Sequence, residues 1–361
     1  MALTKLGIRH FRNLHSVDFD PAPDLNIIVG KNASGKTSIL EAIYFLGRVT
    51  SFRTNRFDRM LQKGQETLIV YGKLKSKNGE IVPFGVQKDA KTVKIRINEQ
   101  KITKVSELVT NLPLQVIHPN SHQLLEEGPK FRRRFLDWGV FHVEQTFYPA
   151  WQRYQIAIKQ RNTALRNKSG KDLICVWNKE LIESGDILDK LRKQYVKDLQ
   201  DLLPQYIIPI LGDMNSRVEY QQGWQKELEF AEALEQSIEK DIMRGYTTVG
   251  PQRADVKIMV DDVLANERIS RGQQKILVTG LLLAQAGLFT KKTGEKCILL
   301  IDDVAAELDS VNREALLSIL MDMDVQMFLT SIEQDTLASI LHGKRPGKMF
   351  HVEHGNLSEV I

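Results

Sequence analysis

The segment that most constrains this chain is Gly30-Lys31-Asn32-Ala33-Ser34-Gly35-Lys36-Thr37, which fills every fixed position of the pattern G-x-x-x-x-G-K-[ST]. The apolar run Leu25–Val29 before it predicts a buried strand, and residues 38–46 after it predict a helix. Glycines in such a turn let backbone N–H groups converge on phosphates at the positive end of the helix. We expect all eight residues to bind a nucleotide, with Lys36 reaching the β- and γ-phosphates and Thr37 holding Mg²⁺.

A second apolar run, residues 297–301, predicts a central strand that delivers Asp302 and Asp303. Ligands of open α/β sheets bind beyond the carboxyl ends of the strands. We therefore expect Asp302 to ligate Mg²⁺, directly or through water, and Asp303 to orient or deprotonate an attacking water. Asp303 and Lys36 are the candidate catalytic residues, and Glu307 is the alternative carboxylate. The plainer interpretation is that the two acids only begin a turn.

Length and apolar content predict more than one lobe. A single core stops growing near about 250–300 residues, and this chain has 361.

No apolar run approaches the length of about 18 residues typical of a membrane span, and residues 1–5 lack the apolar core of a signal peptide. We expect a cytoplasmic protein with no membrane partner, in which the two cysteines, Cys175 and Cys297, are reduced core residues.

Periodicity along the chain predicts where the lobes lie. Strands are expected near residues 6–11, 68–74, 81–86, 93–97, 114–117, 256–260, 326–330 and 349–352. Between residues 123 and 245 the apolar positions recur at helical spacing, and residues 273–288 also predict a helix. The sequence thus predicts an α/β nucleotide-binding lobe, residues 1–122 and 246–361, with a helical lobe, residues 123–245, inserted into it.

Basic residues are concentrated in one segment. Residues 130–171 contain ten basic and two acidic residues, a local net charge of +8 in a chain whose total is +5. Such a segment indicates a polyanionic partner. Its densest part supplies the candidate DNA-binding residues Lys130, Arg132, Arg133 and Arg134. The alternative is a solvated helical face held by salt bridges.

A third motif, residues 269–275, precedes the acidic pair by about 30 residues and resembles the L-S-G-G-Q signature of ABC-type ATPases, with Arg271 at a glycine position. In that family the signature serine and the helix behind it touch the γ-phosphate of ATP held by the other subunit. The resemblance implies this role for Ser270, Gly272 and Gln273, with Ser270 counted as catalytic. Residues 306–309 resemble the loop that the family uses across the dimer interface.

The whole chain resembles the RecF family of bacterial DNA-repair ATPases, which are related to SMC-type heads without the long coiled coil. The matching segments are residues 11–14, the phosphate loop, and residues 128–138, 159–162, 250–255, 270–273 and 302–303. The resemblance implies an ABC-type ATPase head, with a mixed sheet around the phosphate loop and an inserted helical lobe. It also implies that Arg12 and Asn13 contact the nucleotide; for Arg12 the alternative is a surface ion pair.

The function implied by the resemblance is ATP-dependent DNA binding in replication, recombinational repair and SOS induction. Such a protein binds single-stranded and duplex or gapped DNA, dimerises on ATP, and with RecO and RecR helps to load RecA at single-strand gaps. Weak, DNA-stimulated ATP hydrolysis then acts as the dimerisation switch. Rival interpretations are an SMC-like ATPase acting at DNA ends, a transporter-type cassette, and an interaction scaffold with a vestigial site.

Four further polar side chains have candidate roles. Gln252 stands where the RecF family commonly has histidine. Glutamine can donate and accept hydrogen bonds but does not titrate, so a role in positioning other groups fits it better than a role in proton transfer. Gln115 is the candidate sensor of the γ-phosphate. The equal alternative is that Gln115 is a structural residue at the edge of the core. His118 and His122 have helical i, i+4 spacing, but Pro119 between them and the lack of a third ligand disfavour a metal site.

Overall fold

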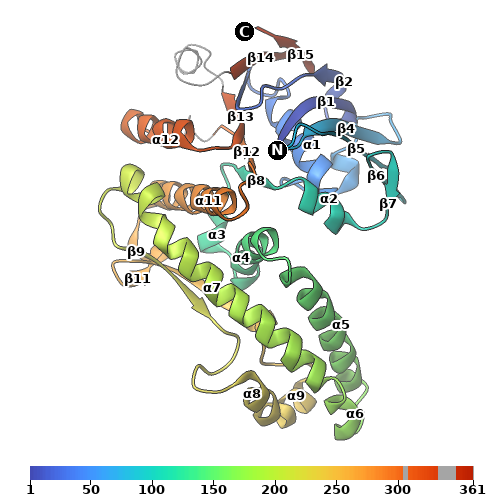
Figure 1. Ribbon diagram of the computed structural model, residues 1–361, viewed down its shortest axis with the longest axis vertical. Helices are drawn as coiled ribbons and strands as arrows, with labels where there is room; N and C mark the ends of the chain where they lie inside the picture. The colour runs from blue at the N-terminus through green and yellow to red at the C-terminus, as the bar shows by residue number, and fades with distance from the viewer. Residues whose placement is uncertain (304–307, 332–346, 361) are drawn as a thin grey trace. The chain divides into compact units, whose positions relative to one another are not determined.

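The computed structural model describes residues 1–303, 308–331 and 347–360 and divides into two compact units (Figure 1). Unit 1 comprises Met1–Ser121 and Ala286–Ile361, and unit 2 comprises His122–Gln285. Within the described residues, no helix combines the length and the apolar character that a membrane crossing requires.

Unit 1 contains two six-stranded sheets. The antiparallel sheet has, in order, β2 (Leu14–Phe19), β1 (Ala2–Phe11), β4 (Leu68–Lys75), β5 (Ile81–Lys88), β6 (Val93–Ile97) and β7 (Gln100–Ile102). The mixed sheet has β15 (Asn356–Glu359), β14 (Gly347–Glu353), β3 (Leu25–Val29), β13 (Gln326–Ser331), β12 (Ile298–Ile301) and β8 (Leu114–Ile117). Pairing is parallel from β14 to β8, and β15 is antiparallel. Both ends of the chain therefore build one sheet around β3.

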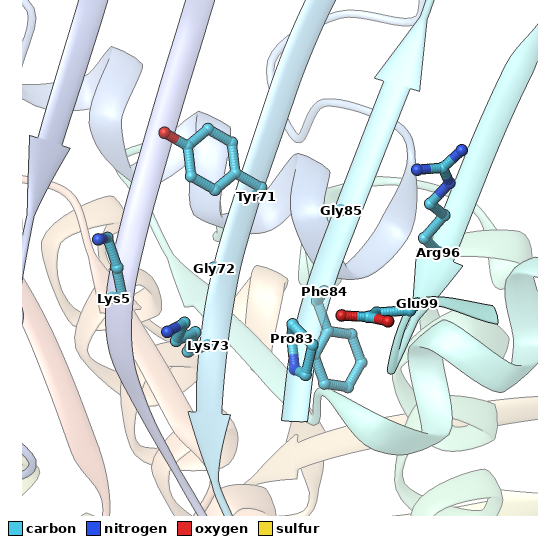
Figure 2. A pocket seen from close by; sticks show the side chains of 9 residues that line it. All are labelled: Lys5, Tyr71, Gly72, Lys73, Pro83, Phe84, Gly85, Arg96 and Glu99. Carbon is cyan, nitrogen blue, oxygen red and sulfur yellow. The ribbon is translucent and has the colours of Figure 1, made fainter. Parts of the chain in front are cut away.

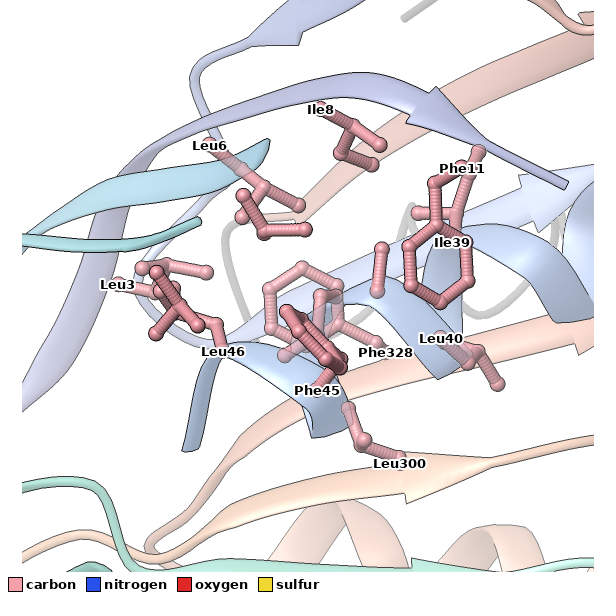
Figure 3. Packing of buried hydrophobic residues seen from close by; sticks show 14 of the residues in the cluster. Leu3, Leu6, Ile8, Phe11, Ile39, Leu40, Phe45, Leu46, Leu300 and Phe328 are labelled. Carbon is pink, nitrogen blue, oxygen red and sulfur yellow. The ribbon is translucent and has the colours of Figure 1, made fainter. Parts of the chain in front are cut away.

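Helix α1 (Lys36–Arg48) lies in the hydrophobic core of unit 1. It is buried on nearly all sides, as expected for a helix that is apolar around most of its circumference. Figure 3 shows the cluster, in which Phe45 and Leu46 of α1 meet Leu6 of β1 and Phe328 of β13. Removing a buried aromatic side chain such as Phe45 costs about 3–5 kcal/mol. This packing fixes the start of α1, where the phosphate loop ends.

Three more helices lie among the described residues of unit 1. They are α2 (Val105–Asn111), α12 (Ser310–Asp322) and the 3-10 helix η1 (Phe57–Arg59). Helix α11 (Arg271–Thr293) begins in unit 2 and ends in unit 1.

Unit 2 is mainly helical, with one small sheet. Its helices are α3 (Gln123–Glu126), α4 (Pro129–Val143), α5 (Phe147–Arg166), α6 (Lys171–Cys175), α7 (Asn178–Leu211), α8 (Phe230–Gln236), α9 (Ile238–Arg244), the 3-10 helix η2 (Pro251–Arg253) and α10 (Ala265–Arg268). Its sheet has the order β11 (Val263–Leu264), β10 (Asp255–Val260), β9 (Ser216–Gln221). A fully buried ion pair, Arg161 Nη1 to Asp241 Oδ2 at 2.7 Å, joins α5 to α9.

The contacts divide the chain differently from the predicted lobes at one boundary. The first boundary falls after residue 121, beside the predicted 122, but the second falls after residue 285 rather than 245. The physical reason is that β10 pairs along its length with β9, a strand inside the segment for which the sequence predicted helices. Residues 246–285, including the signature motif, therefore group with unit 2.

Candidate nucleotide-binding site

The phosphate loop connects β3 to α1, and its backbone needs glycine. Gly35 is the N-cap of α1 with φ 124°, a conformation that side-chain-bearing residues rarely adopt. A Cβ at Gly30 would clash with the carbonyl oxygen of Val352. Gly35 is thus required by the backbone conformation of the turn, and Gly30 is required because β14 packs closely against it.

Two other turns hold the loop in place. The side-chain amide of Asn13, between β1 and β2, donates to the carbonyl of Ser34 at 3.1 Å and accepts from Ser38 Oγ at 2.8 Å. The N–H of Gly355, in the β14–β15 turn, donates to the same Ser34 carbonyl at 3.1 Å. Asn13 therefore positions the loop, and direct contact with the nucleotide stays a prediction.

Donors gather inside the loop. Lys36 is 4% exposed, and its ammonium donates to the carbonyls of Gly30 at 2.8 Å and Lys31 at 3.2 Å. The Ser34 hydroxyl is buried and has no hydrogen-bond partner among the described residues. A buried hydroxyl without a partner is costly, so it favours a ligand that supplies acceptor oxygens. Phosphate oxygens fit this cradle.

The acidic pair meets the loop at the carboxyl end of β12. Thr37 Oγ1 donates to Asp302 Oδ1 at 2.8 Å, and Thr330 Oγ1 lies 3.0 Å from the same oxygen. Burial raises the pKa of Asp302, while the hydrogen bonds from Thr37 and Thr330 oppose the rise. The N–H of Asp303 donates to Thr330 Oγ1 at 2.9 Å, and Asp303 has φ 48°.

This pair of oxygens fits a magnesium ion. Mg²⁺ takes hard oxygen ligands and is commonly bound by one or two carboxylates together with substrate phosphates. The Thr37 hydroxyl and the Asp302 carboxylate are such ligands, already adjacent. Sequence reasoning missed Thr330, the last residue but one of β13, which is the strand after the acidic pair. A polar residue directly after an apolar run was the available signal.

Arg12 pairs with a buried carboxylate. Its guanidinium donates through Nε and, at 2.6 Å, through Nη2 to Glu41, whose side chain is fully buried in α1. Ser51 Oγ also donates to Glu41, and Arg53 Nη1 lies 3.7 Å from it. Arg12 thus neutralises an internal charge beside the loop, and its predicted nucleotide contact stays a prediction. Sequence reasoning missed Glu41, a charged residue on the apolar helix that follows the loop.

The signature motif is open to solvent. Ser270 and Gly272 are exposed at the start of α11, where a Cβ on Gly272 would meet nothing closer than Ser270 Oγ at 4.0 Å. Ser270 N–H donates to Gln273 Oε1 at 3.0 Å, and Gln273 N–H donates to Ser270 Oγ at 3.3 Å. This reciprocal pair is the hydrogen-bonding pattern of a capping box. It leaves the serine at an accessible helix start.

The basic cluster of α4 separates into two kinds of residue. Arg132 makes a bidentate pair with Asp255 at 2.8 and 2.9 Å, and Arg133 Nη1 donates to the Ala254 carbonyl at 2.7 Å. These two arginines tie α4 to the segment that begins β10. Lys130 and Arg134 are exposed. Of the predicted DNA-binding residues, these two are the ones available to an external phosphate.

The remaining candidates lie elsewhere. Gln115 is buried in β8 opposite Leu299, before the carboxyl end of the strand, so its sensor role stays a prediction. Gln252 accepts from Tyr154 Oη and donates to the Val249 carbonyl at 2.8 Å, an internal positioning role. Glu307 lies outside the described residues. Among the residues described, no group of three or more His, Cys, Asp or Glu side chains is arranged to hold a metal.

The similarity to known proteins extends over the whole chain. Residues 2–357 match the family described as RecF/RecN/SMC N terminal domain. The chain is 40% identical to the DNA replication and repair protein RecF of Shewanella piezotolerans over 361 residues, covering 100% of each chain. It is 39% identical to the protein of the same name from Pseudomonas aeruginosa, covering 99% of this chain and 98% of that one.

Solved structures show the same fold. One described as the recombination mediator protein RecF-ATP in the RecFOR pathway matches with a TM-score of 0.88 and 24% identity over 100% of this chain and 98% of that chain. An SMC head bound to the C-terminal winged-helix domain of ScpA matches with a TM-score of 0.63 and 14% identity, covering 100% of this chain and 97% of that one. The predicted ATPase-head fold with an inserted helical lobe is thus confirmed.

Proposed function

Because this chain belongs to the RecF family, within the RecF/RecN/SMC N-terminal domain proteins, we propose that it is an ATP-controlled DNA-binding protein of replication and recombinational repair. Full-length relatives at 40% identity carry the name DNA replication and repair protein. The observation that carries the proposal is the hydrogen bond from Thr37 to Asp302, because it places two metal ligands together directly after the buried Lys36 of the phosphate loop.

Each polar residue at the site has its own contact with ATP, its metal or the attacking water. The ammonium of Lys36 exchanges its bonds to loop carbonyls for the β- and γ-phosphate oxygens, and Ser34 Oγ gains an acceptor. Thr37 and Asp302 would hold Mg²⁺, which neutralises charge that develops on the phosphates. Asp303 orients the attacking water and accepts its proton, with its backbone N–H fixed by Thr330.

Dimerisation on ATP provides the switch. Ser270 is exposed in unit 2, and its hydrogen bonds among the described residues are to Gln273 and Gln274 at the start of its own helix, so its outer side can meet the γ-phosphate held by a second subunit. A ligand that contacts both subunits stabilises only the dimer. Weak, DNA-stimulated hydrolysis removes these shared contacts and opens the dimer.

The partners follow from the family. We infer that the protein acts in the cytoplasm on single-stranded, duplex and gapped DNA, and that with RecO and RecR it helps to load RecA at gaps during repair and SOS induction. The solved relative described as RecF-ATP is placed in the RecFOR pathway. Exposed basic residues act on phosphates, which gives affinity with little base specificity.

The test is sedimentation of the full chain with and without Mg-ATP, repeated with duplex, single-stranded and gapped DNA. We expect a monomer without ATP, a dimer with ATP, and DNA binding that follows the dimer. Lys36→Met is the matched control, because the phosphates lose their fixed ammonium partner and ATP-dependent dimerisation should disappear. ATP-dependent dimers of Lys36→Met would contradict the site, and a wild type that ignores ATP would contradict the switch.

A further inference from the structure

The outer face of the antiparallel sheet in unit 1 carries a recess of about 660 Å³. Figure 2 shows Lys5 and Lys73 on one side of this recess and Arg96 with Glu99 on the other. Gly72 and Gly85 line it between them. The opposite face of the same strands packs on the core around α1, so side chains that alternate outward here are not needed for that packing.

Like charges lie directly opposite each other on this outer face. Lys5 of β1 is the cross-strand partner of Lys73 of β4, and Arg96 of β6 is the partner of Lys101 of β7. Directly opposed like charges destabilise a sheet. All four side chains are exposed, and none forms an ion pair with a described residue. An external anion would remove the repulsion.

The same sheet also contains compensated charge, so the repulsion is not a general property of its surface. Arg9 Nη2 donates to Asp18 Oδ2 at 2.6 Å, and the Tyr71 hydroxyl donates to Asp18 Oδ1 at 2.6 Å. Glu99 is the one acidic residue among the residues that line the recess, against three basic ones. Lys75 of β4 and Lys94 of β6 are also exposed and form no ion pair with a described residue, so the positive charge extends beyond the recess along these strands.

We propose that this face, defined by Lys5, Lys73, Arg96 and Lys101, is a docking surface for the phosphate backbone of DNA. The proposal rests on the proposed DNA-binding function and names a surface for it outside the basic cluster of α4. From β1 to β7 the face crosses four strand intervals, about 19 Å at about 4.8 Å each. That length matches several phosphates of a DNA strand, which follow each other at about 3.4 Å along the helix axis.

Charge and composition favour nucleic acid over a protein partner. Lysine is depleted at the cores of protein interfaces, which use aromatic and aliphatic anchors. Here Lys5, Lys73 and Arg96 surround a floor that includes Gly72 and Gly85. Tyr71, Pro83 and Phe84 also line the recess, but Phe84 is buried in the core and the Tyr71 hydroxyl is bound to Asp18, so neither aromatic side chain is a free anchor for a protein. Phosphate contacts of this kind contribute affinity without sequence information.

The experiment compares two triple variants with equal loss of charge. The test variant is Lys5→Gln with Lys73→Gln and Arg96→Gln. The control variant is Arg59→Gln with Lys63→Gln and Lys291→Gln, three exposed basic residues of unit 1 that lie outside these strands. Binding of a fluorescent duplex in Mg-ATP is measured over a salt series, together with ATP-dependent dimerisation and the unfolding temperature without DNA.

We expect the test variant to bind DNA about tenfold or more weaker at low salt, with the slope of log affinity against log salt reduced by about 0.9 for each lost phosphate contact. Its dimerisation should be normal, and its unfolding temperature equal to or above that of the wild type because the like-charge repulsion is relieved. The control variant should retain the wild-type slope.

Other outcomes overturn the proposal in distinguishable ways. A test variant with wild-type affinity and slope, in a protein whose wild type binds DNA with ATP, overturns the docking surface and leaves the proposed function standing. A wild type that binds no DNA overturns the proposed function and the surface with it. Loss of poly-glutamate binding with unchanged DNA binding would assign the face to an acidic protein instead.

Discussion

The hydroxyl of Thr37 lies 2.8 Å from Oδ1 of Asp302, although 265 positions separate the two residues in the chain. Thr37 is in the first turn of α1, and Asp302 directly follows β12. The contact exists because α1 packs in a core that also contains Leu300 of β12, so the start of the helix and the end of the strand face each other. Thr330 completes the arrangement from β13.

Replacing Asp302 by Asn should separate stability from function. The amide can keep hydrogen bonds to Thr37 and Thr330 while removing a buried negative charge. We expect the ligand-free Asp302→Asn protein to unfold at a higher temperature than the wild type at pH 7, and to lose the increase in ATP affinity that Mg²⁺ gives. Thermal unfolding and ATP titrations with and without Mg²⁺ check both. A destabilised variant with intact Mg²⁺ dependence would contradict the assignment.

The same carboxylate predicts a pH dependence. Burial raises the pKa of Asp302 in the folded state above its unfolded value. Between these two pKa values the folded state holds more protons than the unfolded state, so this group lowers the free energy of unfolding as pH rises through that window. The stability difference between Asp302→Asn and the wild type should therefore grow from pH 4 upwards and then level off. Urea unfolding of both proteins across this range measures it.

Asp303→Asn should leave binding intact and slow the chemistry. Asn tolerates the left-handed backbone that Asp303 adopts, so the turn should persist. The amide cannot accept a proton from water as a carboxylate does, and we expect hydrolysis to fall by about 100-fold while ATP affinity stays unchanged. Exposed Asp322→Asn is the control. Single-turnover hydrolysis at wild-type speed would move the catalytic role to another carboxylate, with Glu307 the alternative.

The basic cluster of α4 predicts two different phenotypes. Arg132→Ala leaves Asp255 without its bidentate partner and should lower the free energy of unfolding by about 2 kcal/mol. Lys130→Gln with Arg134→Gln removes exposed charges and should change stability by less than about 0.5 kcal/mol while reducing the salt dependence of DNA binding. Denaturant unfolding and a salt series on each variant check this. If Arg132→Ala and the double variant lost DNA binding equally and were equally stable, the division of the cluster into paired and free residues would be wrong.

The part of the site that sequence alone predicts is local in the chain. The loop, the strand before it and the helix after it form one continuous segment with a fixed spacing, and β12 is an apolar run that ends in two acids. Such patterns depend on neighbours in sequence. The predicted strands of unit 1 were found for the same reason, because each is apolar or alternates.

What sequence missed depends on contacts between distant segments. β9 (Ser216–Gln221) is a polar strand whose existence follows from pairing with β10, and that pairing moves residues 246–285 into unit 2. From the sequence, Arg132 was predicted to bind DNA, but in the structure it pairs with Asp255, 123 positions away. Propensity carries no information on such partners, since tertiary contacts override it.

Ser270→Arg tests whether two subunits share each ATP site. Ser270 is exposed at the start of α11, so the substitution should leave the chain's own phosphate loop unaffected and cost the fold only the capping hydrogen bond to Gln273. We expect near-normal ATP binding but no dimer, because the added bulk obstructs the surface that meets the partner's γ-phosphate.

Mixing Ser270→Arg with Lys36→Met then supplies the decisive comparison. One subunit brings an intact loop and the other an intact signature, so each mixed dimer holds one complete site and hydrolysis should partly recover. The measurement is ATP turnover of each variant alone and of the mixture, at concentrations where the wild type is monomeric without ATP. Full turnover by Ser270→Arg alone would contradict the shared site, because hydrolysis would then need only the loop and the acidic pair of one chain.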